Sequence, residues 1–235
     1  MTRRRWIADE THENTAALTG EHAVHLGRVL RAQIGQEFDI ASGDVVRRGT
    51  IVSISDERVE FALGEEVAAV AAANVVLVLA IFKFDRMEWA IEKCTEIGVA
   101  RIVPVVASRT EAHLASAAVK RHERWLRLAR QAAEQSRRLA PPEISAPSKL
   151  KELARTSTAP HIVLAESERK IRLRDVLPPS PPEAVLAVGP EGGWTGDELR
   201  WFRESGWTMA SLGSTILRAE TAAITATALA VELLM

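Results

Sequence analysis

Two glycine-containing segments late in the chain carry residue types suited to binding a flat ligand. Gly189-Pro-Glu-Gly-Gly193 follows the apolar stretch Ala184 to Val188, and Leu212-Gly-Ser-Thr-Ile-Leu-Arg218 directly precedes the run that begins at Glu220. Glycine at the end of a strand lets main-chain N–H and C=O groups approach a ligand closely, and it permits φ angles closed to other residues. Together the segments predict a site for a nucleoside cofactor, with Ile216 and Leu217 supplying apolar surface for adenine.

Each glycine segment alone also fits an ordinary turn, because Gly and Pro mark strand-to-helix turns in most α/β proteins. A Walker-type phosphate loop is excluded, since Trp194 and Thr195 stand where that motif has Lys and Ser or Thr. The dinucleotide fingerprint is excluded too, because it belongs to the first strand-turn-helix unit of its domain. A shared site is favoured because two such loops at the ends of neighbouring strands are less expected by chance than one.

Arg218 and Glu220 place a cation and a carboxylate at the start of the last predicted helix. Beside a bound cofactor, such a pair could serve electrostatic or acid–base catalysis. The alternative is structural. Glu220 would then complement the positive end of the helix dipole, and Arg218 would form an ion pair with it.

The composition is that of an ordinary soluble globular protein. The 235 residues fit one large domain or two modest ones, and an apolar content of 47% is ample for a core. The basic N-terminus leads into no apolar run of signal-peptide length, so we expect a cytoplasmic protein. Cys94 is the only cysteine, which excludes an internal disulfide and a multi-thiolate metal site. We expect Cys94 to be buried, and we expect no metal.

Short alternating segments separated by turn residues fill the amino-terminal part and predict a small β-barrel. The expected elements are strands at Arg5–Ala8, Glu37–Ala41, Val45–Ile54 and Arg58–Leu63 and one helix at about Glu21–Arg31. The Ala/Val-rich stretch Glu65–Ala73 marks the expected boundary, although it could equally form a last strand. The predicted domains are therefore residues 1–72 and 73–235.

After this boundary, apolar strands alternate with amphipathic helices, which predicts an α/β domain with a mainly parallel sheet. The expected strands are Val75–Phe82, Ile102–Val106, Ile162–Ala165, Ala184–Val188 and Thr208–Leu212. The expected helices run from a capping box of Asp85 and Glu88 to Gly98, and over Ala117–Arg138, Ile171–Leu177, Gly196–Glu204 and Glu220–Leu234. The last helix is apolar nearly all round but too short to span a membrane, so we expect it to be buried in the core or against a second subunit.

Three stretches resemble the family that methylates N3 of a uridine in small-subunit ribosomal RNA, which is part of the SPOUT superfamily: Lys83 to Val99, Gly189 to Gly193, and Leu212 to Ala222. Further similarity lies in His25 to Arg31 with Gly35, in Arg109, and in Glu134 to Arg138. The resemblance spans nearly the whole chain. This chain departs from the family in having Ser214-Thr215 where Pro-Arg is usual and Ala219 where Thr is usual.

The resemblance implies a PUA-like, RNA-binding β-barrel joined to a SPOUT methyltransferase domain whose carboxyl end threads a trefoil knot. It further implies a homodimer that binds S-adenosylmethionine in that knot. Carried onto this sequence, the cofactor-binding residues are Leu164, Ala165, Glu166, Gly189, Pro190, Glu191, Gly192, Gly193, Leu212, Gly213, Ser214, Ile216 and Leu217.

The predicted reaction is methylation of a uridine that is flipped out of its stack, in 16S ribosomal RNA or the small ribosomal subunit. Glu220 is the candidate base for the N3 proton, and Glu191 is the alternative carboxylate. Arg218 is the candidate for stabilising negative charge on the uracil oxygens.

RNA phosphates are expected to contact a set of basic side chains. The formal net charge is only −1, but basic residues outnumber acidic ones between Lys83 and Leu139. The predicted contacts are Arg3, Arg4, Arg5, Arg28, Arg31, Arg109, Lys120, Arg124, Arg127, Arg137 and Arg138. For any one of them the alternative is a solvated helix face.

Two other functions stay open from the sequence. One keeps the SPOUT fold but changes the product, to ribose 2′-O or guanosine methylation of another RNA position. The other is a non-catalytic RNA-binding assembly factor, in which the glycine segments are only turns.

Overall fold

The computed structural model describes residues 5–68, 73–153, 158–178 and 181–234, and the chain divides into two compact units. The first unit comprises Met1–Ala71 and Ala133–Pro141, and the second comprises Ala72–Ala132 and Pro142–Met235. The predicted domain boundary after residue 72 falls at 69–72, outside the described residues. Residues 133–141, which lie in the second of the predicted domains, belong by their contacts to the first unit.

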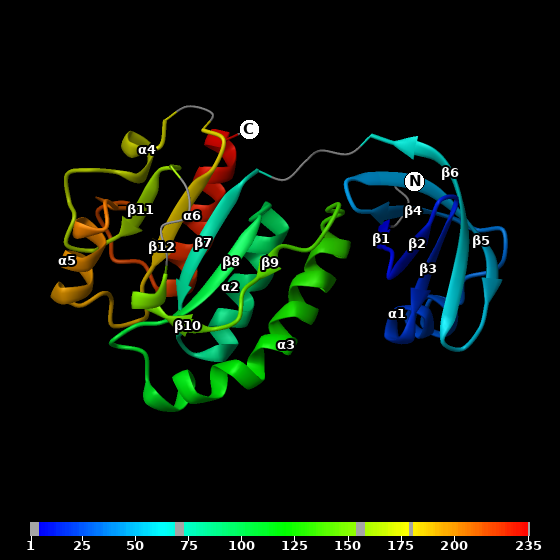
Figure 1. Cartoon of the computed structure of the whole chain (residues 1–235), viewed down its shortest axis with the longest axis horizontal. Coiled ribbons are helices and arrows are strands. Elements are labelled where there is room, and N and C mark those ends of the chain that lie inside the picture. The colour runs from blue at the N-terminus through cyan, green and yellow to red at the C-terminus, as the bar shows by residue number, and fades with distance from the viewer. Residues whose placement is uncertain (1–4, 69–72, 154–157, 179–180, 235) are drawn as a thin grey trace. The chain divides into compact units, whose positions relative to one another are not determined.

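The first unit is built on a six-stranded sheet with the order β1-β4-β5-β6-β3-β2. Its strands are β1 Arg5–Ile7, β2 Glu10–His12, β3 Thr15–Thr19, β4 Glu37–Ser42, β5 Val45–Ile54 and β6 Arg58–Val67. β1 pairs with β4 in parallel, and the other neighbours are antiparallel. Two register shifts interrupt the β5–β6 ladder, where both strands bend strongly (Figure 1).

The core of the first unit follows the alternation that predicted its strands, with Trp6, Ile40, Ile51 and Phe61 buried. The sequence missed β2 and β3, because every residue of β2 is exposed and β3 is Ala-rich. In place of the single predicted helix, a short α1 (Gly20–Val24) continues as a π-helical turn (His25–Val29). The backbone then enters the left-handed region at Arg31, with a φ of 52°.

The second unit contains a seven-stranded sheet in which every pairing is parallel, so the predicted mainly parallel α/β fold is confirmed. The strand order is β10-β8-β7-β12-β11-β13, and β9 also pairs with β8. The strands are β7 Val75–Ala80, β8 Arg101–Val106, β9 Glu143–Ile144, β10 Ser148–Lys149, β11 His161–Leu164, β12 Ala184–Val188 and β13 Thr208–Ala210.

The helices of the second unit cover both faces of this sheet. They are α2 Phe84–Ile97, α3 Ala112–Gln135, α4 Leu173–Val176, α5 Gly196–Glu204 and α6 Ala219–Leu234, with a 3-10 turn at Leu150–Glu152. Val75, Leu77 and Leu79 of β7 pack in the cluster that contains α2, α3 and α6, whereas the alternate residues of β7 pack in the cluster that contains Phe202 of α5. Figure 1 shows α6, in red, behind the central strands. Burial on both faces explains why β7 and β12 read as continuous apolar runs.

The predicted capping box at the start of α2 was wrong. The N-cap residue is Lys83, no side chain caps the helix, and Asp85 lies in its first turn. Glu88 instead accepts hydrogen bonds from α3, at 2.9 Å from Arg124 Nε and 3.3 Å from Arg121 Nη1. α3 itself begins and ends earlier than predicted, at Ala112 and Gln135.

α6 packs one face into the core, as its apolar character predicted. Thr227 lies in that face and its Oγ1 is 3.4 Å from Sγ of Cys94 on α2. Cys94 is fully buried, as expected, and burial raises the pKa of its thiol to about 12. Leu229, on the other face of α6, keeps 39% of its surface exposed. Among the described residues, no helix has both the length and the apolar character needed to cross a bilayer.

Among the glycines of the first unit, Gly49 of β5 is the one at which an added Cβ atom would meet the closest neighbour. A Cβ atom there would lie 2.4 Å from Cγ1 of Ile40 and 3.3 Å from the Phe61 side chain. We therefore expect Gly49→Ala to lower the free energy of unfolding of this unit by about 1–3 kcal/mol through overpacking. Urea unfolding followed by circular dichroism measures the loss.

Gly64→Ala on the adjacent strand is the matched control, because a Cβ there would make an ordinary 3.4 Å contact with the Arg48 carbonyl. Equal stability of the two variants would contradict the packing described for β5.

Candidate active site

A cavity of about 770 Å³ lies at the carboxyl edge of the parallel sheet, the edge at which open α/β folds bind ligands. Segments that follow β11, β12 and β13 supply most of its wall, and α2 and the loop after β8 contribute one arginine each. The lining residues are Arg86, Arg109, Leu164 to Arg169, Arg172, Val188 to Trp194, Leu199, Ala210 to Ala219, and Ala222. The volume falls in the range of small-molecule sites.

The two glycine segments line this one cavity, although 18 residues lie between them in the chain. Every residue predicted to bind the cofactor is in its wall: Leu164, Ala165, Glu166, Gly189 to Gly193, Leu212, Gly213, Ser214, Ile216 and Leu217. The site predicted from the sequence is therefore assembled by the fold. The individual roles of these residues stay predictions.

The surrounding structure favours glycine at two of these positions. A Cβ atom on Gly189 would lie 3.2 Å from Nε1 of the buried Trp194, so a side chain there would displace the indole or the loop. Gly193 has a φ of 67°, in the left-handed region that favours glycine. The loop after β12 thus depends on glycine for its path along the cavity.

Glu198 of α5 joins the loop after β12 to the loop after β8. Its carboxylate accepts hydrogen bonds from the main-chain N–H of Thr195 at 2.7 Å and from that of Ser108 at 2.7 Å. Thr195 in turn caps α5 by accepting from the Glu198 N–H at 3.2 Å. The neighbour of Ser108 is Arg109, which donates to the Gly192 carbonyl. The Glu198 carboxylate is therefore hydrogen-bonded to both loops, and Arg109 adds a second connection between them.

The pKa of Glu198 reflects this arrangement. Burial acts to raise the pKa, but the hydrogen bonds from the Thr195 and Ser108 N–H groups outweigh burial and hold the pKa below its usual value. The carboxylate is therefore charged at neutral pH.

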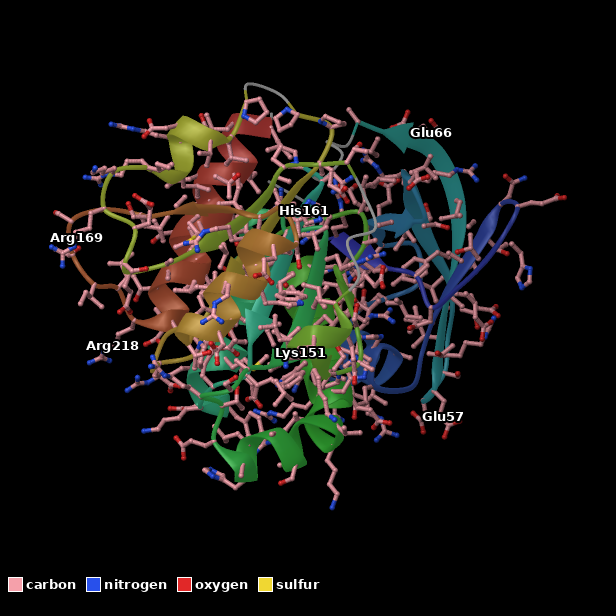
Figure 2. The ribbon with its side chains drawn as sticks, turned by 60° about the vertical axis from the view of Figure 1, so that its left-hand side comes forward. Glu57, Glu66, Lys151, His161, Arg169 and Arg218 are labelled. Carbon is pink, nitrogen blue, oxygen red and sulfur yellow. The ribbon has the colours of Figure 1, made fainter. Side chains whose placement is uncertain are left out.

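Arg218 and Glu220, the predicted catalytic pair, are placed differently. Arg218 is exposed and lines the cavity, and Figure 2 shows it pointing outward on the same side as Arg169, another lining residue. Glu220 does not line the cavity: it is buried at the start of α6, with Oε1 3.9 Å from Nε of Arg86. In the described part of the chain, the alternative ion pair between Arg218 and Glu220 is not formed.

Sequence reasoning missed three arginines of the cavity: Arg86, Arg169 and Arg172. The last two lie in the segment after β11, where Glu168 accepts hydrogen bonds from the N–H groups of Lys170 and Ile171 at 2.7 and 3.0 Å. These bonds, the one from Ile171 foremost, lower the pKa of Glu168. The available signal was the highly charged run from Glu166 to Arg172 directly after an apolar strand.

The predicted RNA contacts lie in both units. Arg3 and Arg4 are outside the described residues, Arg5 donates to the Arg137 carbonyl, and Arg28 pairs with Asp56 at 2.8 Å. Arg31, Lys120 and Arg127 are exposed, whereas Arg124 is engaged by Glu88. Burial lowers the pKa of Arg138 to about 10. Within the described ranges, no cluster of three or more His, Cys, Asp or Glu side chains could hold a metal ion.

Residues 70–231 match the model of a family described as an RNA methyltransferase domain. A ribosomal RNA small subunit methyltransferase E from Rickettsia conorii is 30% identical over 96% of this chain and 93% of its own length. The chain belongs to the RNA methyltransferase family.

Two solved structures share the fold of this RNA methyltransferase over nearly its whole length. A methyltransferase from Legionella pneumophila, solved in complex with SAM, has a TM-score of 0.87 and 29% identity and covers 98% of this chain and 97% of its own. A ribosomal RNA small subunit methyltransferase E from Neisseria gonorrhoeae, bound to S-adenosyl methionine, has a TM-score of 0.85 and 28% identity and covers 97% of this chain and 96% of its own.

Replacing Glu198 by Gln should weaken the hydrogen bonds that connect the loop after β8 to the loop after β12. The pKa of Glu198 is lower in the folded protein than in the unfolded chain, so the charged carboxylate stabilises the fold. This stabilisation is complete at a pH above the pKa of the unfolded state. It is lost as the pH falls through the pKa of the folded state. We expect Glu198→Gln to cost about 1–2 kcal/mol at pH 7 and progressively less below about pH 4. Thermal unfolding from pH 7 to pH 3.5 measures the difference.

Asp197→Asn is the control, because Asp197 lies on the same turn of α5 and makes an exposed ion pair with Arg200 at 2.8 Å. We expect it to change stability by less than about 0.5 kcal/mol. A Glu198→Gln cost that stays constant across this pH range would show that the charge of Glu198 does not matter.

Proposed function

We propose that this protein transfers the methyl group of S-adenosylmethionine to N3 of a uridine in 16S ribosomal RNA of the small subunit. The observation that carries the proposal is the convergence of both glycine segments on one cavity of about 770 Å³ in a chain of the RNA methyltransferase family. Relatives named ribosomal RNA small subunit methyltransferase E support the choice of RNA, and the cofactor bound to the Neisseria relative supports the choice of methyl donor.

The residues of the cavity fit this cofactor. Leu212, Ile216 and Leu217 offer apolar surface to an adenine ring, and the main chain from Gly189 to Gly193 offers donors and acceptors that no Cβ would shield at its three glycines. When bound, S-adenosylmethionine supplies a methyl group whose carbon–sulfur bond breaks as the bond to N3 forms. The loops fixed by Glu198 hold the wall of the cavity in one geometry, which favours reaction by positioning.

Proton removal from N3 needs a carboxylate that can reach the uracil ring. Glu191 is exposed in the cavity wall, with Oε1 3.4 Å from the N–H of Lys83, whereas Glu220 is buried behind the wall. Of the two predicted carboxylates, the geometry favours Glu191 as the group that accepts the proton directly. Arg218 is exposed and lines the cavity, which supports its proposed role of stabilising negative charge on a uracil oxygen.

We also propose the finer architecture that the resemblance implies: a PUA-like RNA-binding barrel in residues 1–72 and a knotted SPOUT domain in residues 73–235. Ser211 N donates to the Ile171 carbonyl at 2.9 Å, so the loop after β11 is hydrogen-bonded to the segment that leads into α6. This contact supports a knot in which the carboxyl end of the chain passes through that loop. Partial exposure of the apolar α6 at Leu229 supports a homodimer. A cytoplasmic location follows from the proposed substrate.

Nucleoside mass spectrometry tests the proposed reaction. After incubation of 16S ribosomal RNA or small subunits with the protein and methyl-labelled S-adenosylmethionine, we expect label in N3-methyluridine. Label in a 2′-O-methylated nucleoside or in a methylated guanosine would replace the proposed product. Binding of RNA without any transfer would favour an assembly factor.

RNA affinity should depend on salt through the exposed cations of α3. We expect Lys120→Ala and Arg127→Ala each to reduce the slope of log affinity against log salt by about one unit, because each removes one phosphate contact. Filter binding from 50 to 300 mM salt, as a rough working range, measures the slope. Arg200→Ala is the control, since Arg200 pairs with Asp197 on α5 and is not a predicted contact. Unchanged slopes for Lys120→Ala and Arg127→Ala would remove α3 from the RNA surface.

A further inference from the structure

Glu220 is a buried carboxylate with an unusual lack of hydrogen bonds. Its side chain is 6% exposed, and among the described residues its Oε2 has no hydrogen-bond partner. The cation nearest to it is Arg86 of α2, whose Nε lies 3.9 Å from Oε1. A carboxylate taken out of water without compensation is costly, so a role in the site is a better explanation than packing.

A helix-capping role does not account for Glu220. Carboxylates that cap helices in this chain accept hydrogen bonds from main-chain N–H groups, as Glu198 does from Thr195 at 2.7 Å and Asp175 does from Arg172 at 3.0 Å. Within the described part of the molecule, no such bond is made by Glu220, although it lies in the first turn of α6. The helix dipole favours a negative charge at this position but does not fix the direction of the side chain.

Arg86 is the group through which Glu220 can act on the cavity. Its side chain is 34% exposed and lines the cavity, and it leaves α2 between Asp85, which is exposed, and Met87, which is fully buried. Arg86 therefore both lines the cavity and lies 3.9 Å, at its Nε, from the buried carboxylate.

We infer that Arg86 is a catalytic residue that presents a fixed positive charge to the uracil ring, and that Glu220 is a positioning residue that holds the Arg86 guanidinium. This inference rests on the proposed function and assigns Glu220 a different part from that of a base. When N3 loses its proton, negative charge spreads onto the two carbonyl oxygens of uracil. A guanidinium held in place before the reaction stabilises that charge without having to reorient.

A double-mutant cycle tests the coupling. We expect Arg86→Gln and Glu220→Gln each to slow single-turnover methyl transfer by about 10²-fold at saturating cofactor and RNA, the usual effect of removing one preorganised donor. The double variant should be no slower than Arg86→Gln alone, because Glu220 acts through Arg86. Affinity for S-adenosylmethionine, measured by calorimetry, should change by less than about threefold.

The pH profile separates positioning from base catalysis. The rate of methyl transfer should rise with pH as N3 loses its proton. If Arg86 and Glu220 act as one unit, each single variant should shift this rise to higher pH, and by a similar amount. If Glu220 were the base, Glu220→Gln would remove that rise and would slow Arg86→Gln further. Multiplicative effects of the two changes, or transfer by Arg86→Gln at the wild-type rate, would overturn the inference.

A spectroscopic measurement keeps the inference testable apart from turnover. In NMR spectra of the whole chain labelled with ¹⁵N-arginine, the Nε–H signal of Arg86 can be assigned because it is lost in Arg86→Lys. The chemical shift of this signal should change in Glu220→Gln. An unmoved signal would disprove the contact. Arg101→Gln and Glu143→Gln are the controls, since they break an exposed pair at 2.8 Å that does not line the cavity, and they should leave both the rate and the Arg86 signal unchanged.

The failure of this inference is distinguishable from the failure of the proposed function. Absence of N3-methyluridine with the unaltered protein would refute the proposed function, and with it the catalytic part of the inference. If Arg86→Gln formed N3-methyluridine at the wild-type rate, the inference would be refuted but the proposed function would stand.

Discussion

The candidate active site depends on the hydrogen bonds that the Glu198 carboxylate accepts from two loops at the carboxyl edge of the sheet. Loops that carry glycine have many accessible conformations, and a cavity wall made of them needs an external constraint. Glu198 supplies this constraint from a helix whose own N-cap, Thr195, is part of the same network. Parallel strands bring the loops to one edge, and this carboxylate selects one arrangement of them.

The sheet that carries these loops gains its stability on both faces. Alternate residues of β7 and β12 pack into two separate apolar clusters, so neither strand presents a polar face. At the carboxyl edge of the sheet, by contrast, charged groups such as Glu220 are buried close to the cavity. Few directed contacts hold them there.

Much of this could be predicted from the sequence, because the responsible signals are local. The preference for glycine arises from the nearby Trp194 indole at Gly189 and from the backbone φ at Gly193, and the apolar runs of β7 and β12 arise from burial. Arg86 was missed because nothing in its neighbours indicates the cavity, and Glu88 was misassigned because its partners lie far away on α3. The burial of Glu220 was missed for the same reason: it depends on where α2 packs against α6.

The discontinuity of the first unit limits how this protein can be rearranged. Ala133, near the end of α3, packs with Ile7, Ala41 and Val46 in a cluster of the first unit. A transferable module would have to include both chain segments, since Met1–Ala71 alone would leave these three side chains without one of their apolar neighbours. Gene fusion or exchange at a single crossover point would therefore separate groups that fold together. Recombination should preserve this pair of segments as one inherited unit.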